Sequence, residues 1–141
     1  MLIVEIKSER ARQFSSIVIY FDNGKVLLLK RKDSVPYGGL WGFPGGGAEK
    51  GETPKEAAIR ETAEETGIKV LPEDLVFLQK VDSPDKRKVH VFACNNFEGN
   101  VDAQKVYKEH DGYEWVAMDE LKDYDKPDNS DGLIKKALSM L

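Results

Sequence analysis

The chain has 141 residues, of which 40% are apolar and 33% are charged, and its net charge is −4. This length suits one domain with a buried core and is short for two, while the mildly acidic balance argues against a surface that binds polymeric nucleic acid. The single cysteine, Cys94, excludes an internal disulfide, and no apolar run is long enough to span a bilayer. We therefore expect one cytoplasmic domain, residues 1–141, that does not enter a membrane.

The first part of the chain predicts strands. Residues 2–6 fit a short edge strand, and residues 14–21 fit a buried strand rich in β-branched and aromatic side chains. Asp22-Asn23-Gly24 is a strong turn signal, so residues 25–31 are expected to return as the second strand of a hairpin. Arg31 ends that strand, where it can face a phosphate group or simply be solvated.

Residues 33–47 contain two prolines and six glycines and predict a loop. Glycine lets a backbone approach a ligand closely, and the alternative is a flexible connection without a ligand. Trp41 and Phe43 can line a pocket for a base, although most aromatic side chains belong to the core.

A helix is predicted over residues 54–66. Thr53 suits the N-cap, Pro54 suits the first helical position, and Glu56 completes a capping box with Thr53. Gly67 can end the helix in the left-handed conformation.

This helix carries the densest acidic cluster of the chain. Glu61, Glu64 and Glu65 fall within an arc of about 100°, and like charges so close destabilise a helix. They can form a solvated acidic face, or bind a hard divalent cation through carboxylate oxygens. Arg60 lies four residues from Glu56 and from Glu64 and can hold one carboxylate in place. The opposite, mildly apolar side carries Ile59, Thr62, Ala63 and Thr66.

The remaining segments alternate between strand and loop patterns. Strands are expected at 75–81, 88–94 and 113–118, and a loop is expected at 97–112. Asp119 is expected to cap a helical turn at 120–124, and apolar residues at helical spacing predict a terminal helix over 131–141. Strands interleaved with helices indicate an α/β domain with a mixed sheet between helices.

The acidic helix and its approach match a longer pattern. From Gly46 to Ile68 the chain reads G-x5-E-x7-R-E-x-x-E-E-x-G-apolar, and WGFPGG stands directly before it. This resembles the signature of the Nudix hydrolases, which cleave nucleoside diphosphates linked to another group. Thr62 departs from the pattern, since the family usually has an aliphatic residue there, and its place on the buried side makes the departure a matter of packing. The resemblance implies the family's α/β/α sandwich.

The resemblance also implies roles for individual residues. Glutamates at the positions of Glu61, Glu64 and Glu65 hold Mg²⁺ or Mn²⁺ in the family, helped by a backbone carbonyl at the position of Gly45. Glu52 corresponds to a supporting acid and Arg60 to a residue that orients a glutamate.

Family members often add a catalytic glutamate from a loop near the last strands. The candidates are Glu98, Glu109, Asp111 and Glu114. The 8-oxo-dGTPase branch of the family places a metal-binding glutamate five residues before Glu-Trp, and this spacing favours Glu109. Neither histidine, His90 or His110, is given a role.

The implied function is a Mg²⁺- or Mn²⁺-dependent pyrophosphohydrolase for a small nucleotide. We expect a (deoxy)nucleoside triphosphate to be cut to the monophosphate and pyrophosphate. The expected substrate contacts are Arg31, Trp41, Phe43, Gly46 and Asn129. Asn129 sits near where the 8-oxo-dGTPase branch reads a purine, and the alternative is that Asn129 or Ser130 merely caps the terminal helix.

Three other functions are weighed against this one. An ADP-ribose or nucleotide-sugar pyrophosphatase is suggested by Pro84, which lies sixteen residues after Ile68 as in many ADP-ribose hydrolases of the family, although Ser83-Pro84-Asp85 is also an ordinary turn. A non-catalytic nucleotide-sensing module is disfavoured because every glutamate of the pattern is present. An acidic protein-interaction helix would leave the glycine-rich loop unexplained. The sequence gives no indication of the oligomeric state.

Overall fold

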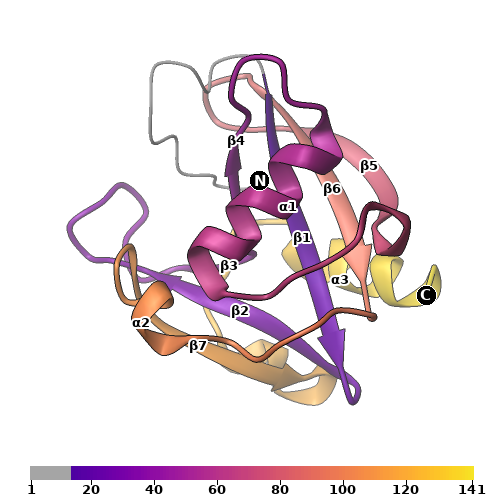
Figure 1. Ribbon diagram of the computed structural model, residues 1–141. Helices are drawn as coiled ribbons and strands as arrows, with labels where there is room; N and C mark the ends of the chain where they lie inside the picture. The colour runs from indigo at the N-terminus through magenta and orange to yellow at the C-terminus, as the bar shows by residue number, and fades with distance from the viewer. Residues whose placement is uncertain (1–13) are drawn as a thin grey trace.

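The computed structural model describes residues 14–141 (Figure 1), so the strand expected at 2–6 lies outside the described residues. The predicted hairpin is confirmed. Strand β1 (Phe14–Asp22) turns into β2 (Lys25–Arg31). Asn23 and Gly24 in the turn both have positive φ, 51° and 75°, as the two-residue turn of a right-twisted hairpin requires.

The expected loop at 33–47 is wrong in part, because it contains two short strands. Strand β3 (Trp41–Gly42) pairs with β2, and β4 (Gly45–Gly47) pairs with the first half of β1. A strand made of three glycines has no alternation of apolar and polar side chains, so the sequence carries no strand signal there.

The expected loop at 97–112 is also wrong in part. It contains the single-turn helix α2 (Ala103–Val106) and the first residues of strand β7 (His110–Ala117). The carboxylate of Asp102 accepts the backbone N–H of Gln104 and caps α2. The two strands before this segment are confirmed as β5 (Val76–Asp82) and β6 (Lys88–Cys94).

The two main helices lie where they were predicted. Helix α1 (Pro54–Thr66) has the full capping box, and Gly67 ends it with φ 83°. Helix α3 (Ser130–Ser139) is the terminal helix. Two 3-10 turns lie at Pro72–Asp74 and Met118–Asp123. The second turn begins one residue before Asp119, and no side chain caps it, so the capping role expected for Asp119 is wrong.

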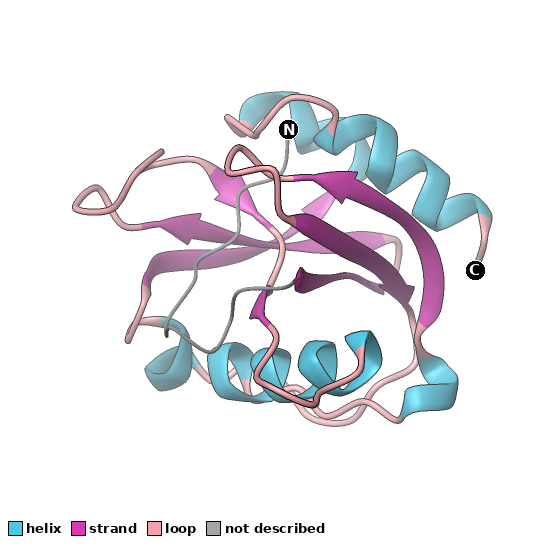
Figure 2. Ribbon diagram, turned by 90° about the horizontal axis from the view of Figure 1, so that it is seen from above, coloured by secondary structure: helices cyan, strands magenta, loops and turns pink. Residues whose placement is uncertain are grey.

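The described strands form one mixed sheet between layers of helix (Figure 2). The order is β3-β2-β1-β6-β5, with β4 on β1 and β7 on β2. Strands β1 and β6 are parallel and the other pairs are antiparallel. Along β1, Val18 and Tyr20 pack in the same cluster as Ala58 of α1, whereas Ile17 and Ile19 pack with Ile134 of α3. This alternation gives the predicted α/β/α sandwich.

The side of α1 that faces the sheet is more polar than expected. Its buried residues are Ala57, Ala58, Glu61, Thr62, Glu65 and Thr66. Thr62 is fully buried, as predicted, but Ile59 and Ala63 are only half-buried. The acidic cluster is therefore divided, with Glu61 and Glu65 inside and Glu64 outside. Within residues 14–141, no helix has the length and apolar character needed to cross a membrane.

Candidate functional site

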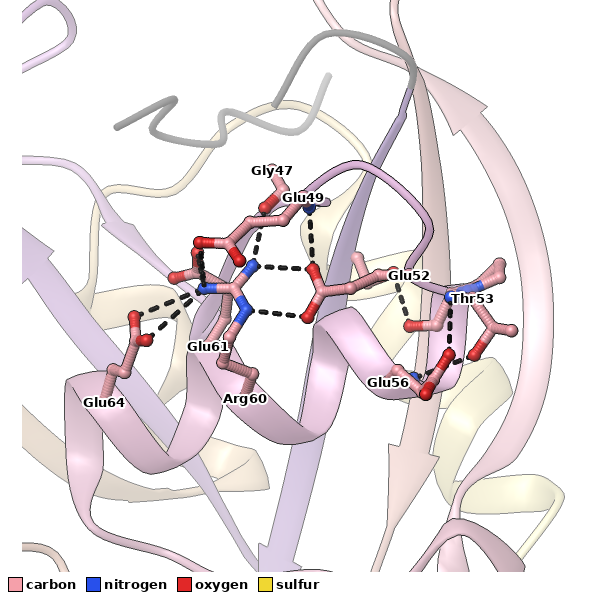
Figure 3. Close-up of polar contacts among 10 residues, drawn as sticks. Gly47, Glu49, Glu52, Thr53, Glu56, Arg60, Glu61 and Glu64 are labelled. Atoms are coloured by element: carbon pink, nitrogen blue, oxygen red, sulfur yellow. Dashed lines mark hydrogen bonds and ion pairs between the residues drawn. The ribbon is translucent and has the colours of Figure 1, made fainter. Parts of the chain in front are cut away.

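Arg60 lies at the centre of the polar contacts around α1 (Figure 3). Its Nε donates to Oε2 of Glu52 at 2.7 Å, and one terminal nitrogen donates to Oε1 of Glu52 at 2.9 Å. The same nitrogen donates to the carbonyl oxygen of Gly47 at 3.0 Å. The other terminal nitrogen donates to Glu61 at 3.0 Å and reaches Glu64 at 3.4 Å. Arg60 thus joins β4, the turn before α1 and the helix itself.

The pair of Arg60 and Glu52 is a bidentate fork, which is the strongest geometry for these groups. Hydrogen bonds from Arg60 hold the pKa of the Glu52 carboxyl below its usual value, and the backbone N–H of Glu49 adds to this. The bond with Glu52 in turn raises the pKa of Arg60. Both groups therefore remain charged near neutral pH.

Strand β4 packs too closely for side chains at Gly46, which lies against a carboxylate of α1, and at Gly45, which lies against β1. A Cβ on Gly46 would come within 2.6 Å of the carboxyl carbon of Glu61, and a Cβ on Gly45 would come within 2.2 Å of the carbonyl oxygen of Ser16. The backbone N–H of Gly45 donates to Oε1 of Glu65 at 2.7 Å. The glycines thus let the backbone of β4 lie close to β1 at Gly45 and to the buried face of α1 at Gly46.

Glu65 contacts His110, a residue for which no role was predicted. Nε2 of His110 lies 3.7 Å from Oε2 of Glu65, and the side chains are 9% and 3% exposed. A lone histidine carries no motif, and the contact joins residues 45 positions apart, so only the folded chain reveals it.

The structure separates the four loop acids. Glu114 lies opposite Leu28, which packs on the α3 side of the sheet, so Glu114 is on the face away from α1. The backbone of Glu98 forms an isolated β-bridge with the backbone of Lys69, beyond the end of α1. Asp111 is exposed.

Glu109 is half-buried and directly precedes His110, which touches the α1 acid Glu65.

The expected base contacts lie on the other face of the sheet. Phe43 is buried in the core cluster that includes α3, and Trp41 packs against that cluster with its ring edge-on to Tyr124 at 5.0 Å. Asn129 is exposed, with φ 72°, and its side chain makes no capping bond to α3. The capping alternative for Asn129 is therefore wrong. These residues are not gathered with the glutamates of α1, although Phe43 is only two residues from Gly45.

Arg31 lies near the α1 side of the sheet. It pairs with His110 across the ladder between β2 and β7, so the two side chains share a face. Its Nε donates to the carbonyl oxygen of Pro36 at 3.0 Å, which orients the guanidinium along the 33–40 loop.

The acidic side chains of the site carry the type of ligand atom that a hard divalent cation binds. Glu61, Glu64, Glu65 and Glu109 offer carboxylate oxygens, which Mg²⁺ and Mn²⁺ prefer. Gly46 leaves room for the carboxylate of Glu61 at the backbone, and Glu64 is exposed at the edge of α1. Across residues 14–141, no three His, Cys, Asp or Glu side chains stand close enough to hold a metal ion. Two of these acids, Glu61 and Glu64, are instead held by Arg60, which also binds Glu52.

Two surface pockets, of about 280 and 390 Å³, adjoin the segment 95–101 and share Asn96 and Phe97. Neither is lined by the glutamates of α1 or by Arg60. They are therefore separate from the carboxylate site.

Comparison with known proteins places this geometry in a family. The family model of the NUDIX domain matches residues 10–137. A CTP pyrophosphohydrolase of Escherichia coli is 31% identical over 72% of this chain and 73% of that protein. An ADP-ribose pyrophosphatase of Methanocaldococcus jannaschii is 45% identical over 49% of this chain, and the match spans only 38% of that relative's own length.

The fold comparison agrees. The crystal structure of a MutT NUDIX hydrolase from Burkholderia pseudomallei superposes with a TM-score of 0.75 at 25% identity, over 88% of this chain and 96% of that one. The resemblance seen in residues 46–68 is thereby confirmed, and the chain belongs to the NUDIX domain family.

Proposed function

We propose that the protein is a Mg²⁺- or Mn²⁺-dependent pyrophosphohydrolase. It hydrolyses a (deoxy)nucleoside triphosphate to the monophosphate and pyrophosphate. The observation that carries this proposal is the burial of Glu61 and Glu65 against a strand of glycines, beside the charged fork of Arg60 and Glu52. A helix that served only as a solvated surface would not bury its carboxylates, because burying an anion costs several kcal/mol unless partners offset it.

Each residue of the site has a task in this proposal. Glu61, Glu64, Glu65 and Glu109, with the carbonyl oxygen of Gly45, are the proposed metal ligands. A divalent ion held there would offset the charge of the phosphates and lower the pKa of an attacking water. Arg60 keeps Glu61 and Glu64 at the same edge of α1, and Glu52 holds Arg60 in place.

Glu109 is the preferred loop acid for a reason of position. Its neighbour His110 touches Glu65, whereas Glu114 faces the α3 side and Glu98 pairs with Lys69. Arg31 is proposed to meet the phosphates from the same face as His110. Gly46 would let the substrate approach the backbone, while Trp41, Phe43 and Asn129 would contact the base from the other face of the sheet.

The triphosphate is the preferred substrate class because the CTP pyrophosphohydrolase of Escherichia coli is similar to this chain over 72% of its residues and over 73% of the relative's own length. ADP-ribose is the second candidate, since the relative from Methanocaldococcus jannaschii acts on it and shares 45% identity in the matched segment. Both substrates contain a phosphoric anhydride bond, which is the bond that the carboxylate site would hydrolyse.

A panel of nucleotides separates these possibilities. Purified protein with millimolar Mg²⁺ is incubated with dGTP, 8-oxo-dGTP, dATP, CTP and ADP-ribose, and the products are resolved by chromatography. We expect monophosphate and pyrophosphate from at least one triphosphate, with a higher kcat/KM than for ADP-ribose. A preference for ADP-ribose over every triphosphate would refute the substrate class, and intact nucleotides throughout would favour a sensing module that binds without cleaving.

A further inference from the structure

His110 is buried at the start of β7, and its imidazole faces the carboxylate of Glu65. The contact of 3.7 Å joins Nε2 to Oε2, the oxygen that does not take the N–H of Gly45. Glu65 therefore has a backbone donor on one oxygen and an imidazole beside the other. A buried carboxylate needs such partners, because it has lost most of its contact with water.

An irregularity in the sheet brings His110 to this position. Lys30 pairs with Gly112, but Arg31 pairs with His110, so Asp111 is an extra residue in β7. Without a bulge, His110 would point to the same face as Gly112, because side chains alternate along a strand.

The packing of Gly112 and Tyr113 shows which face of the sheet each residue of β7 points to. A Cβ on Gly112 would lie 3.9 Å from the ring of Trp41, which packs on the α3 side. Tyr113 packs with the cluster that contains Ala58 of α1. The bulge thus turns His110 from the α3 side to the α1 side, where it meets Glu65. Bulges commonly re-aim a side chain beside an active site.

The contact also fixes the segment that carries Glu109. Glu109 directly precedes His110, and its backbone N–H donates to the carbonyl oxygen of Val106 at 3.2 Å. A side chain that holds residue 110 against α1 therefore limits how far Glu109 can move from Glu65.

We propose that His110 is a positioning residue, which holds the carboxylate of Glu65 and the Glu109 segment in the arrangement that binds a divalent cation. This inference rests on the proposed function of the site. Partners that orient a metal ligand from behind commonly contribute 10- to 100-fold in metal affinity or activity. The competing explanation is that His110 merely fills space between β7 and α1.

The contact itself is tested in metal-free protein by NMR. The ring nitrogens of both histidines are observed in wild-type protein and in Glu65→Gln. His90 is the internal control, because its ring lies on β6 against Phe14 and Phe77. We expect Glu65→Gln to shift the Nε2 signal of His110 and to leave the signals of His90 in place. An unchanged His110 ring would overturn the proposal.

The role is tested with two amides that differ only in reach. Glutamine at 110 carries its amide nitrogen about as far from the backbone as Nε2, whereas asparagine ends near the level of Nδ1. The Kd for Mn²⁺ is measured by electron paramagnetic resonance without nucleotide, and melting temperatures are compared. We expect His110→Asn to weaken Mn²⁺ binding about 10- to 100-fold and His110→Gln to stay within about threefold of wild type. His90→Gln serves as the matched control.

The outcomes are distinguishable. Equal Mn²⁺ affinities for wild type and His110→Asn, or equal losses in the Asn and Gln variants at unchanged melting temperature, would overturn the positioning role alone. Wild-type protein with no Mn²⁺ affinity and no hydrolysis would overturn the proposed function, and the role of His110 toward a metal ligand with it.

Discussion

Arg60 is engaged on all three guanidinium nitrogens, by Glu52, Glu61, Glu64 and the carbonyl oxygen of Gly47. Lysine could not reproduce this arrangement, because an ammonium is a point charge without the planar fork that Glu52 requires. A single arginine therefore sets the positions of three carboxylates and of strand β4. Its charge also offsets the repulsion among the acids of one helix face.

The backbone conformation of Asn129 limits which substitution can test its side chain. The residue has φ 72°, where alanine is strained by about 1–2 kcal/mol, so Asn129→Ala would mix a backbone effect with any loss of base contact. Asn129→Gly keeps this conformation available and removes only the amide.

We expect Asn129→Gly to leave the free energy of unfolding within about 1 kcal/mol of wild type, since the side chain makes no capping bond. If the amide reads the base, KM should rise for the preferred purine and the discrimination between dGTP and dATP should fall. Urea unfolding and steady-state kinetics measure the two quantities. Unchanged kinetics for both purines would remove Asn129 from the substrate contacts.

Strand β4 is the element that lets the site form. It lies between β1 and α1 with all three residues buried, and Gly46 faces the carboxylate of Glu61. Gly42 in the adjacent short strand β3 has open space where a Cβ would be. The two glycines therefore form a matched pair for the same substitution.

We predict that Gly46→Ala destabilises the protein by about 1–3 kcal/mol, as overpacking of a filled site does, and also lowers kcat by displacing Glu61. Gly42→Ala should change stability by no more than about 0.5 kcal/mol and keep the activity. Urea unfolding at matched protein concentration gives the first result and nucleotide hydrolysis the second. Equal effects of the two substitutions would show that β4 has no special relation to Glu61.

At the scale of the whole molecule, the sequence predicted the parts that rest on local signals. The hairpin follows from Asp22-Asn23-Gly24, and α1 begins and ends at its capping residues, Thr53 and Gly67. The α/β/α sandwich follows from the order of elements and from the family resemblance, and the comparison of folds confirms it.

The parts that the sequence could not predict depend on long-range contacts. Strand β4 has no side chains to form a pattern, and the bulge at Asp111 appears only in the register between β2 and β7. Burial of Glu61 and Glu65 contradicts the usual rule that acids are exposed. These departures from local rules occur at the candidate site, where function commonly overrides them.

The most direct test of the carboxylate site compares kcat for Glu65→Gln and Glu114→Gln with wild type, at saturating Mg²⁺ and on the best substrate of the panel. Glutamine preserves shape, and its Oε1 can still accept the N–H of Gly45, so circular dichroism should show an intact fold. Losing several kcal/mol of transition-state stabilisation predicts a fall of about 100-fold or more for Glu65→Gln. Glu114→Gln, on the opposite face of the sheet, should retain wild-type turnover. A folded Glu65→Gln protein with near-normal kcat, or an equal loss in both variants, would contradict the assignment of the site.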